Sequence, residues 1–264
     1  MSCFKWSWAW VLPAVFVAAC ASAPPAREDA AEETGAPLDV GVEQAFSALE
    51  AADHWRERNA ARDQLVGLGR AALPLVLAGA RHEVVEVRRI CHEILRQHHG
   101  TEPEALACII AGLDDEDWGF IAYPAAFHLG EQRLAEGRGP LHALLERGDL
   151  PQRLAAAVYK SLGELGEVGM VTSLWLGLGS DDPYTRYLSN LGMRGLTGRD
   201  LMEFGYDSPW EGAFVSGPSV ATVQGQPLEK ARARIERWEA VERFTLWLKT
   251  DRPQAFEVLE TTLW

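Results

Sequence analysis

Histidine and cysteine are side chains that could bind a transition-metal ion such as zinc. Several of them gather in one stretch of the chain: Cys91, His92, His98, His99 and Cys108. Their spacing matches no standard zinc site, and no Cys-x-x-Cys pair occurs. His98 and His99 stand directly before Gly100, where histidine complements the negative end of a helix. We therefore expect no metal site and no bound cofactor.

Cys91 and Cys108 stand among apolar neighbours such as Ile94 and Ile109, which indicates small buried side chains rather than a disulfide framework. If the domain is exported, a bridge between the two cysteines is chemically permitted. The sequence leaves this alternative open, because it does not show whether their Cβ atoms approach each other.

The common catalytic and phosphate-binding signatures are missing from the sequence. No GxSxG, Walker phosphate loop, HExxH, GxGxxG or EF-hand loop occurs. Tyr206 and Asp207 are adjacent groups that could exchange protons, beneath a long stretch from 208 to 227 that contains Gly, Ser and Pro. The prediction is a protein without enzymatic activity, and the alternative is an enzyme with its site near residues 204–227.

Length and charge narrow the class of protein further. The chain has 264 residues, of which 47% are hydrophobic, so it can bury a sizeable core. Acidic residues outnumber basic ones by 38 to 25, which gives a formal net charge of -13. Binding to nucleic acid depends on clustered Lys and Arg. An acidic chain of this kind is not expected to bind nucleic acid.

The N-terminus has the features of a signal peptide. A single positive charge at Lys5 precedes an apolar run from Trp8 that is shorter than the ~20 residues a membrane-spanning helix needs. The run ends in Val17, Ala18, Ala19 and Cys20, which resemble the lipobox of bacterial lipoproteins. The resemblance implies that residues 1–19 are cleaved off and that Cys20 carries a lipid. The alternative is an ordinary cleavable signal with an accidental cysteine.

Residues 20–37 are rich in Ala, Pro and acidic residues and poor in bulky apolar ones, which predicts a disordered tether. Such a tether would separate a folded domain from the bilayer. Ala21 follows the cysteine, and under the usual sorting rule for lipoproteins this favours the outer membrane. We expect an exported protein, anchored by its lipid and facing the periplasm or the cell surface.

Residues 38–198 form a succession of short helix-like segments with a common period. Leucines recur at intervals of 30 to 34 residues, at Leu65, Leu95, Leu129, Leu162 and Leu196. Four residues before them stand Ala61, Cys91, Ala125, Val158 and Gly192, and eight residues before them Glu57, Val87, Ile121, Leu154 and Leu188. One type of helix is therefore repeated five times.

These columns resemble the second helix of HEAT repeats. Val87, Arg88, Cys91 and Leu95 match that pattern in the second unit, and Leu154, Val158, Ser161, Leu162, Gly163, Leu165 and Gly166 match it in the fourth. The expected first helices are Val42–Ala52, Ala71–Gly79, Glu104–Leu113, Pro140–Glu146 and Val168–Leu178. The resemblance implies an all-α fold, an α-α superhelix of about five helical hairpins.

The units depart from the HEAT pattern in two respects. Its arginine is kept as Arg58 and Arg88 and is replaced by Ala122, Ala155 and Ser189. Pro124 also falls inside the expected second helix of the third unit, where it predicts a kink.

Residues 199–264 are expected to form a loop and a helical C-terminal cap. Leu196-Thr197-Gly198 and Phe204-Gly205-Tyr206-Asp207 resemble a tail of bacterial HEAT-like proteins, in which Tyr206 and Asp207 would form a structural turn. The spacing of Leu228, Ala231, Ile235, Trp238 and Val241 predicts one apolar helix face within 228–249. A last helix would follow from Asp251, with Pro253 in its first turn.

The function predicted from these features is a membrane-anchored scaffold that binds a protein or peptide partner. In HEAT-like solenoids the second helices line the concave face. This implies that the residues two and five positions after the first repeated position of each second helix (Glu57, Val87, Ile121, Leu154 and Leu188) point into that face. These are Asn59 and Arg62, Arg89 and His92, Tyr123 and Ala126, Ala156 and Tyr159, and Asn190 and Met193. Arg, aromatic residues and Met are enriched in interface cores. The alternatives are an ordinary solvated face, with the protein a structural envelope component without a discrete ligand, or the enzyme considered above.

Overall fold

The computed structural model describes residues 35–206 and 227–263, and in these ranges the regular structure is entirely helical, without a strand. The predicted all-α class is therefore confirmed. The predicted signal peptide at 1–19, the lipidation site Cys20, most of the tether, Asp207 and the stretch 208–226 lie outside the described residues. The tether was predicted to extend to residue 37, but the first helix already begins at Gly35.

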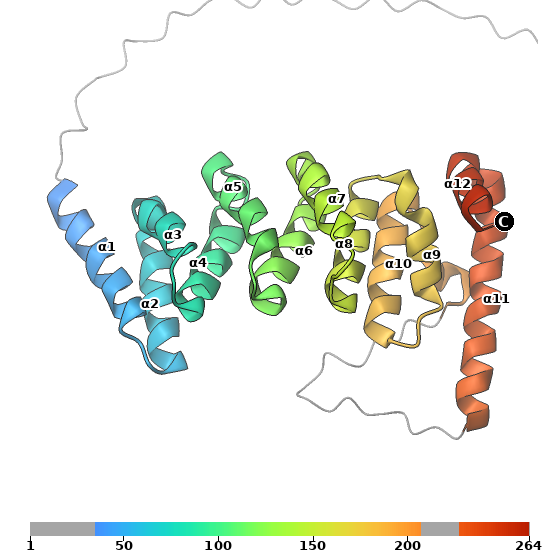
Figure 1. Cartoon of the computed structure of the whole chain (residues 1–264), viewed down its shortest axis with the longest axis horizontal. Coiled ribbons are helices and arrows are strands. Elements are labelled where there is room, and N and C mark those ends of the chain that lie inside the picture. The colour runs from blue at the N-terminus through green and yellow to red at the C-terminus, as the bar shows by residue number, and fades with distance from the viewer. Residues whose placement is uncertain (1–34, 207–226, 264) are drawn as a thin grey trace, which may run out of the picture.

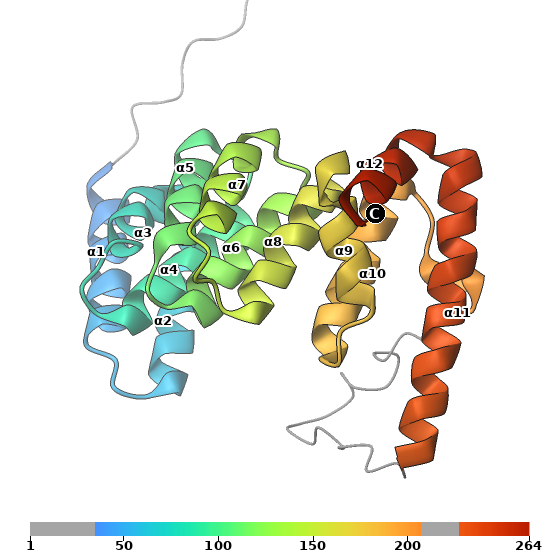
Figure 2. The same ribbon diagram turned by 45° about the vertical axis from the view of Figure 1, so that its right-hand side comes forward.

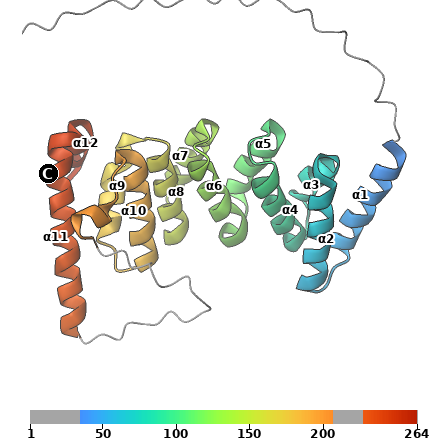
Figure 3. The same cartoon turned by 180° about the vertical axis from the view of Figure 1, so that it is seen from behind.

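Five pairs of helices follow one another in chain order along the long axis of the molecule (Figures 1 and 3). The first helices of the pairs are α1 (Gly35–Glu50), α3 (Leu73–Gly79), α5 (Pro103–Ala111), α7 (Arg138–Glu146) and α9 (Val171–Leu178). The second helices are α2 (Trp55–Leu68), α4 (Val85–His98), α6 (Tyr123–Glu131), α8 (Gln152–Glu164) and α10 (Pro183–Thr197). Each expected helix of the repeat region is present.

The repeated leucines lie where the period predicts, in the core between the pairs. Leu65, Leu95, Leu129 and Leu162 are each at most 1% exposed. The fifth, Leu196, is only half-buried at the edge of a second cluster formed with the C-terminal helices. Leu196 is an exception because α10 aligns with the other second helices at a different residue than the leucine period predicts.

Arginines near the start of three second helices show how α10 aligns with α2 and α4. Arg58 and Arg88 donate to the carbonyls five and six residues before them, in the turn that joins the two helices of a pair. In the fifth pair Arg186 makes the same two bonds, to Ser180 and Asp181. The structural counterpart of Arg88 in α10 is therefore Arg186, three residues before the Ser189 that the leucine period aligned with it. In this register Met193, which is fully buried, takes the place of the repeated leucine.

In the third pair a kink was predicted at Pro124. A π-helix at Trp118–Ala122 directly precedes α6 there, and the amide of Tyr123 donates to the carbonyl of Trp118. Pro124 then falls in the first turn of α6, where a missing N–H does not break a helical hydrogen bond. The irregular π-helical turn thus lies directly before the proline.

Glycines let the second helices α6, α8 and α10 approach one another closely. A Cβ added to Gly130 would lie 2.5 Å from the Cα of Ser161, and one added to Gly192 would lie 2.9 Å from the Cα of Lys160. Contacts of this length leave no room for a larger side chain. The small residues in the sequence pattern therefore mark the places where α8 contacts its two neighbours.

The C-terminal segment packs on the last pair as a helical cap, formed by α11 (Pro227–Asp251) and α12 (Pro253–Leu263) (Figure 2). Phe244 of α11 is fully buried, and Trp175 of α9 donates to Thr245 at 3.1 Å. The predicted apolar face is only partly right, because Ile235 is 60% exposed. The buried stripe instead consists of Ala240, Val241, Phe244 and Leu248.

Candidate functional site

Of the ten residues predicted to line a binding face, five are accessible and five are buried. The accessible residues are half-buried on the second helices: Asn59, Arg62, Arg89, Tyr123 and Tyr159. The others are at most 5% exposed, so they cannot contact a partner and the prediction is wrong for them: His92, Ala126, Ala156, Asn190 and Met193.

The buried positions lie where a second helix contacts the structure that follows it. The imidazole of His92 lies against Gly112, since a Cβ on that glycine would approach its Cε1 to 2.6 Å. Asn190 bonds Asp200 and the amide of Leu201, which follow α10 in the chain. Met193 is buried because the register of α10 differs by three residues from the leucine period. The same register puts half-buried Tyr187 on the face, a residue that the sequence analysis missed.

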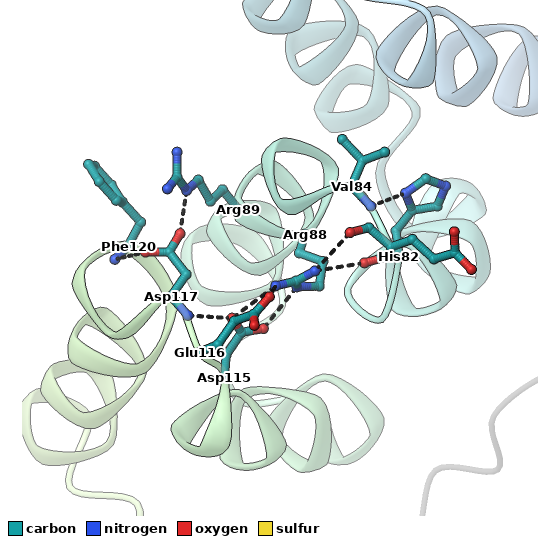
Figure 4. Close-up of polar contacts among 9 residues, drawn as sticks. His82, Val84, Arg88, Arg89, Asp115, Glu116, Asp117 and Phe120 are labelled. Carbon is teal, nitrogen blue, oxygen red and sulfur yellow. Dashed lines mark hydrogen bonds and ion pairs between the residues drawn. The ribbon is translucent and has the colours of Figure 1, made fainter. Parts of the chain in front are cut away.

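Arg88 ties the second pair to the third through a charged network (Figure 4). Its Nε is 2.9 Å from Asp115, and its Nη2 is 3.1 Å from Glu116. Its Nη2 also donates to Asp115, and its Nη1 donates to the carbonyls of His82 and Glu83. Hydrogen bonding from Arg88 contributes to holding the pKa of Asp115 below its usual value, against the opposing effect of burial. This arginine is therefore structural.

Arg89, the neighbouring residue, lies on the accessible face and is also held in place. Its Nε donates to Asp117, and its guanidinium lies 4.4 Å from the centre of the Phe120 ring (Figure 4). Asp117 caps the π-helix by accepting from the amide of Phe120. The ring itself is 63% exposed. Arg89 and Asp117 thus fix an aromatic side chain at the surface.

A cleft of about 280 Å³ lies between the last turn of α4 and helix α6. On α4 its lining residues are C-terminal to Arg89. We call it the α4–α6 cleft. Its lining residues are Arg96, Gln97, Tyr123, Pro124, Phe127, His128 and Glu131. The volume is at the lower end of the range for small-molecule sites, and it fits one or two side chains of a partner.

The charges around this cleft are partly desolvated. Burial lowers the pKa of the Arg96 guanidinium and that of the His128 imidazole. Behind the cleft, the ammonium of Lys160 lies 3.3 Å from the centre of the Phe127 ring and 2.8 Å from Glu164. The Lys160–Glu164 contact lacks hydrogen-bond alignment, and it is an ion pair held by charge.

Next to the cleft, four half-buried rings form a continuous surface that we call the aromatic patch: Tyr123, Phe127, Tyr184 and Tyr187. They surround the buried side chains of Ala156, Ala157 and Leu188. Successive rings lie about 6 Å apart, and the hydroxyls of Tyr123 and Tyr184 are bonded to each other. The patch therefore joins α6, α8 and α10 into one surface.

A larger hollow of about 550 Å³ follows α11. Its lining residues all belong to that helix: Arg234, Ile235, Trp238, Glu239 and Glu242. A hollow lined by one helix offers no converging groups, so it is a weaker candidate site than the α4–α6 cleft.

Tyr206, Cys91 and Cys108 are candidate catalytic and metal-binding residues from the sequence, and all three are buried in the fold. Tyr206 is buried and donates to the carbonyl of Leu178 at 2.9 Å, which leaves it poorly placed for acid–base chemistry. Cys91 and Cys108 are buried free thiols, and burial raises the pKa of Cys91 to about 12. Within 35–206 and 227–263, no group of three or more His, Cys, Asp or Glu side chains is arranged to hold a metal ion.

Comparison of the sequence with protein-family models finds no match, and comparison with curated proteins finds none either. In the described part of the chain no helix is both long and apolar enough to span a membrane.

Proposed function

We propose that this chain is a HEAT-type solenoid that binds a protein or peptide partner on the face formed by its second helices. The repeated core positions and the three equivalent arginines, Arg58, Arg88 and Arg186, support a solenoid. The second helix α8 packs extensively on α6 and on α10, which supports a continuous layer of second helices in this half of the chain. In the proposed solenoid these helices form the inner, concave layer.

The observation that carries the proposal is the aromatic patch beside the α4–α6 cleft. Aromatic and Arg side chains contribute most to binding at protein interfaces, where they fill pockets in a desolvated centre. Here exposed Phe120, held by Arg89, extends the patch toward the N-terminal pairs. A solvated helix face would not gather aromatic rings from two helices around an apolar floor supplied by α8 and α10.

The proposed localisation of the protein rests on its sequence alone. Cys20 would carry the lipid, and residues 21 to 34 would separate the helical pairs from an outer membrane. The binding face would then act in the periplasm or at the cell surface.

Site-specific crosslinking in intact cells tests this function. A photoreactive benzoylphenylalanine replaces Tyr123 or Tyr187 in the full-length chain, and a control variant carries it at Leu176. Leu176 is 54% exposed on the first helix α9. We expect the same partner to be crosslinked from positions 123 and 187 and not from 176.

Two outcomes would contradict the proposal. A partner crosslinked only from position 176 would place binding on the first helices. Absence of any specific crosslink would favour the alternative, a structural envelope component without a discrete ligand.

A further inference from the structure

We propose that the α4–α6 cleft binds a carboxylate of the peptide partner, an Asp or Glu side chain or a chain terminus, through Arg96. An apolar side chain next to that carboxylate would rest on Tyr123 and Phe127. This inference deepens the proposed function and rests on it, because it names the chemistry of the partner at the same face.

Two arginines of this face have carboxylate partners, whereas Arg96 has none in the described residues. Arg62 pairs with Glu93 at 2.9 Å, and Arg89 pairs with Asp117. In the described residues Arg96 has no carboxylate within ion-pair distance, although it lies on the same stripe of α4 as Arg89 and Glu93. Its Nε is buried and has no hydrogen-bond acceptor there.

A partly buried guanidinium without an acceptor is an unusual arrangement. Desolvation penalises the charged group, and buried polar atoms in native proteins are normally paired. A carboxylate in the cleft would give the guanidinium group an acceptor and could match its planar shape with two parallel hydrogen bonds. The unsatisfied donor therefore points to an anionic ligand.

The other lining residues define the rest of the ligand. Pro124 and Phe127 form an apolar wall, and the Gln97 amide offers a further donor at the cleft. Glu131 opposes an anion, but it lies toward α8, where its charge acts on Lys160 and Glu164. Glu93 acts on Arg96 by charge, yet its carboxylate is already bonded to Arg62. An isolated phosphate would leave the apolar wall uncovered, so a carboxylate next to an apolar group fits better.

The test uses two small probes that differ by one charge, N-acetylphenylalanine and N-acetylphenylalaninamide. Binding to the folded full-length chain is followed by NMR, which includes the Nε–Hε signals of the arginines. We expect the carboxylate to bind at least roughly tenfold more tightly than the amide, as one charge-assisted hydrogen bond implies. The Arg96 signal should shift during the titration.

Three variants locate the effect. Arg96→Gln should remove the preference for the carboxylate, and Arg96→Lys should keep part of it. Arg81→Gln is the matched control, because Arg81 is exposed and lies in the turn before α4. It removes the same charge outside the cleft and should leave the preference unchanged. Melting temperatures of all variants confirm that each one is folded.

Several results would overturn the inference. They are equal binding of acid and amide, no binding of either at millimolar concentration, tighter binding of inorganic phosphate, and an equal loss in Arg81→Gln. The crosslinking from positions 123 and 187 does not depend on Arg96. If those crosslinks persist while the probes fail, the binding face stands and only its carboxylate ligand is wrong.

Discussion

His92 is a single buried residue that makes the stability of this fold depend on pH. Its side chain is 2% exposed, and its Nδ1 has no hydrogen-bond partner among the described residues. Burial lowers the pKa of this imidazole from 6.5 to about 4. The folded state therefore holds the neutral ring over a range of pH in which the unfolded chain takes up a proton.

We expect this difference in proton binding to destabilise the protein as the pH falls. Above the unfolded pKa both states are neutral and there is no penalty. Between about pH 7.5 and pH 4.5 His92 should lower the free energy of unfolding by roughly 2–3 kcal/mol. Urea denaturation at several pH values measures this fall, and His92→Leu should make it shallower by that amount. Parallel pH profiles for the two proteins would show that His92 does not contribute.

At the scale of elements, the close approach of α8 and α10 depends on glycine. A Cβ on Gly192 would lie 2.6 Å from Leu174 Cδ2 and 2.9 Å from the Cα of Lys160. The backbone atom cannot move aside without separating the two helices. The packing of these helices also supports the floor of the aromatic patch, formed by Ala156, Ala157 and Leu188.

Gly192→Ala should therefore destabilise the protein by about 1–3 kcal/mol through overpacking. Gly67→Ala is the matched control, because in the described structure nothing lies within 4 Å of a Cβ placed there in α2. Alanine is the better helix former, so this control should be neutral or up to about 1 kcal/mol more stable. Chemical denaturation of both variants gives the comparison. A similar stability change in both would mean that contact between helices is not the cause.

At the scale of the whole molecule, the core is divided along the chain. One apolar cluster extends from Val42 to Leu162, and another joins α9 to the cap formed by α11 and α12. Stacked helical pairs contact mainly their neighbours, so stability is approximately a sum of local terms. Loss of the cap should consequently affect the nearest pair first.

Phe244→Ala tests this division. Phe244 is fully buried between Phe204 and Trp247, and its truncation should cost about 3–5 kcal/mol. We expect native-state hydrogen exchange to accelerate in α9, α11 and α12 while amides of α2 and α4 remain protected. The reverse case, equal acceleration in every helix, would indicate a single cooperative unit.

The sequence by itself determined the helical class, the helix order and most of the core. Leucines at a constant interval and small residues four positions earlier identify a helix face that must be buried wherever the neighbours lie. Acidic residues mark helix starts, since Asp182 caps α10 and Asp117 caps the π-helix before α6. These features are local, because a helix and its apolar stripe are specified within a few turns of chain.

Only the tertiary structure decided which of the remaining positions are accessible. The offset of α10, with Arg186 and Met193 in the repeated places, follows from the bonds of Arg186 to the preceding turn, and the leucine period did not show it. His92 and Asn190 were predicted on a surface, but the segments that follow their helices cover them. The unpaired Arg96 is recognisable only once the partners of Arg62 and Arg89 are known. Exposure and pairing depend on residues distant in the chain, and one sequence does not reveal which of these meet.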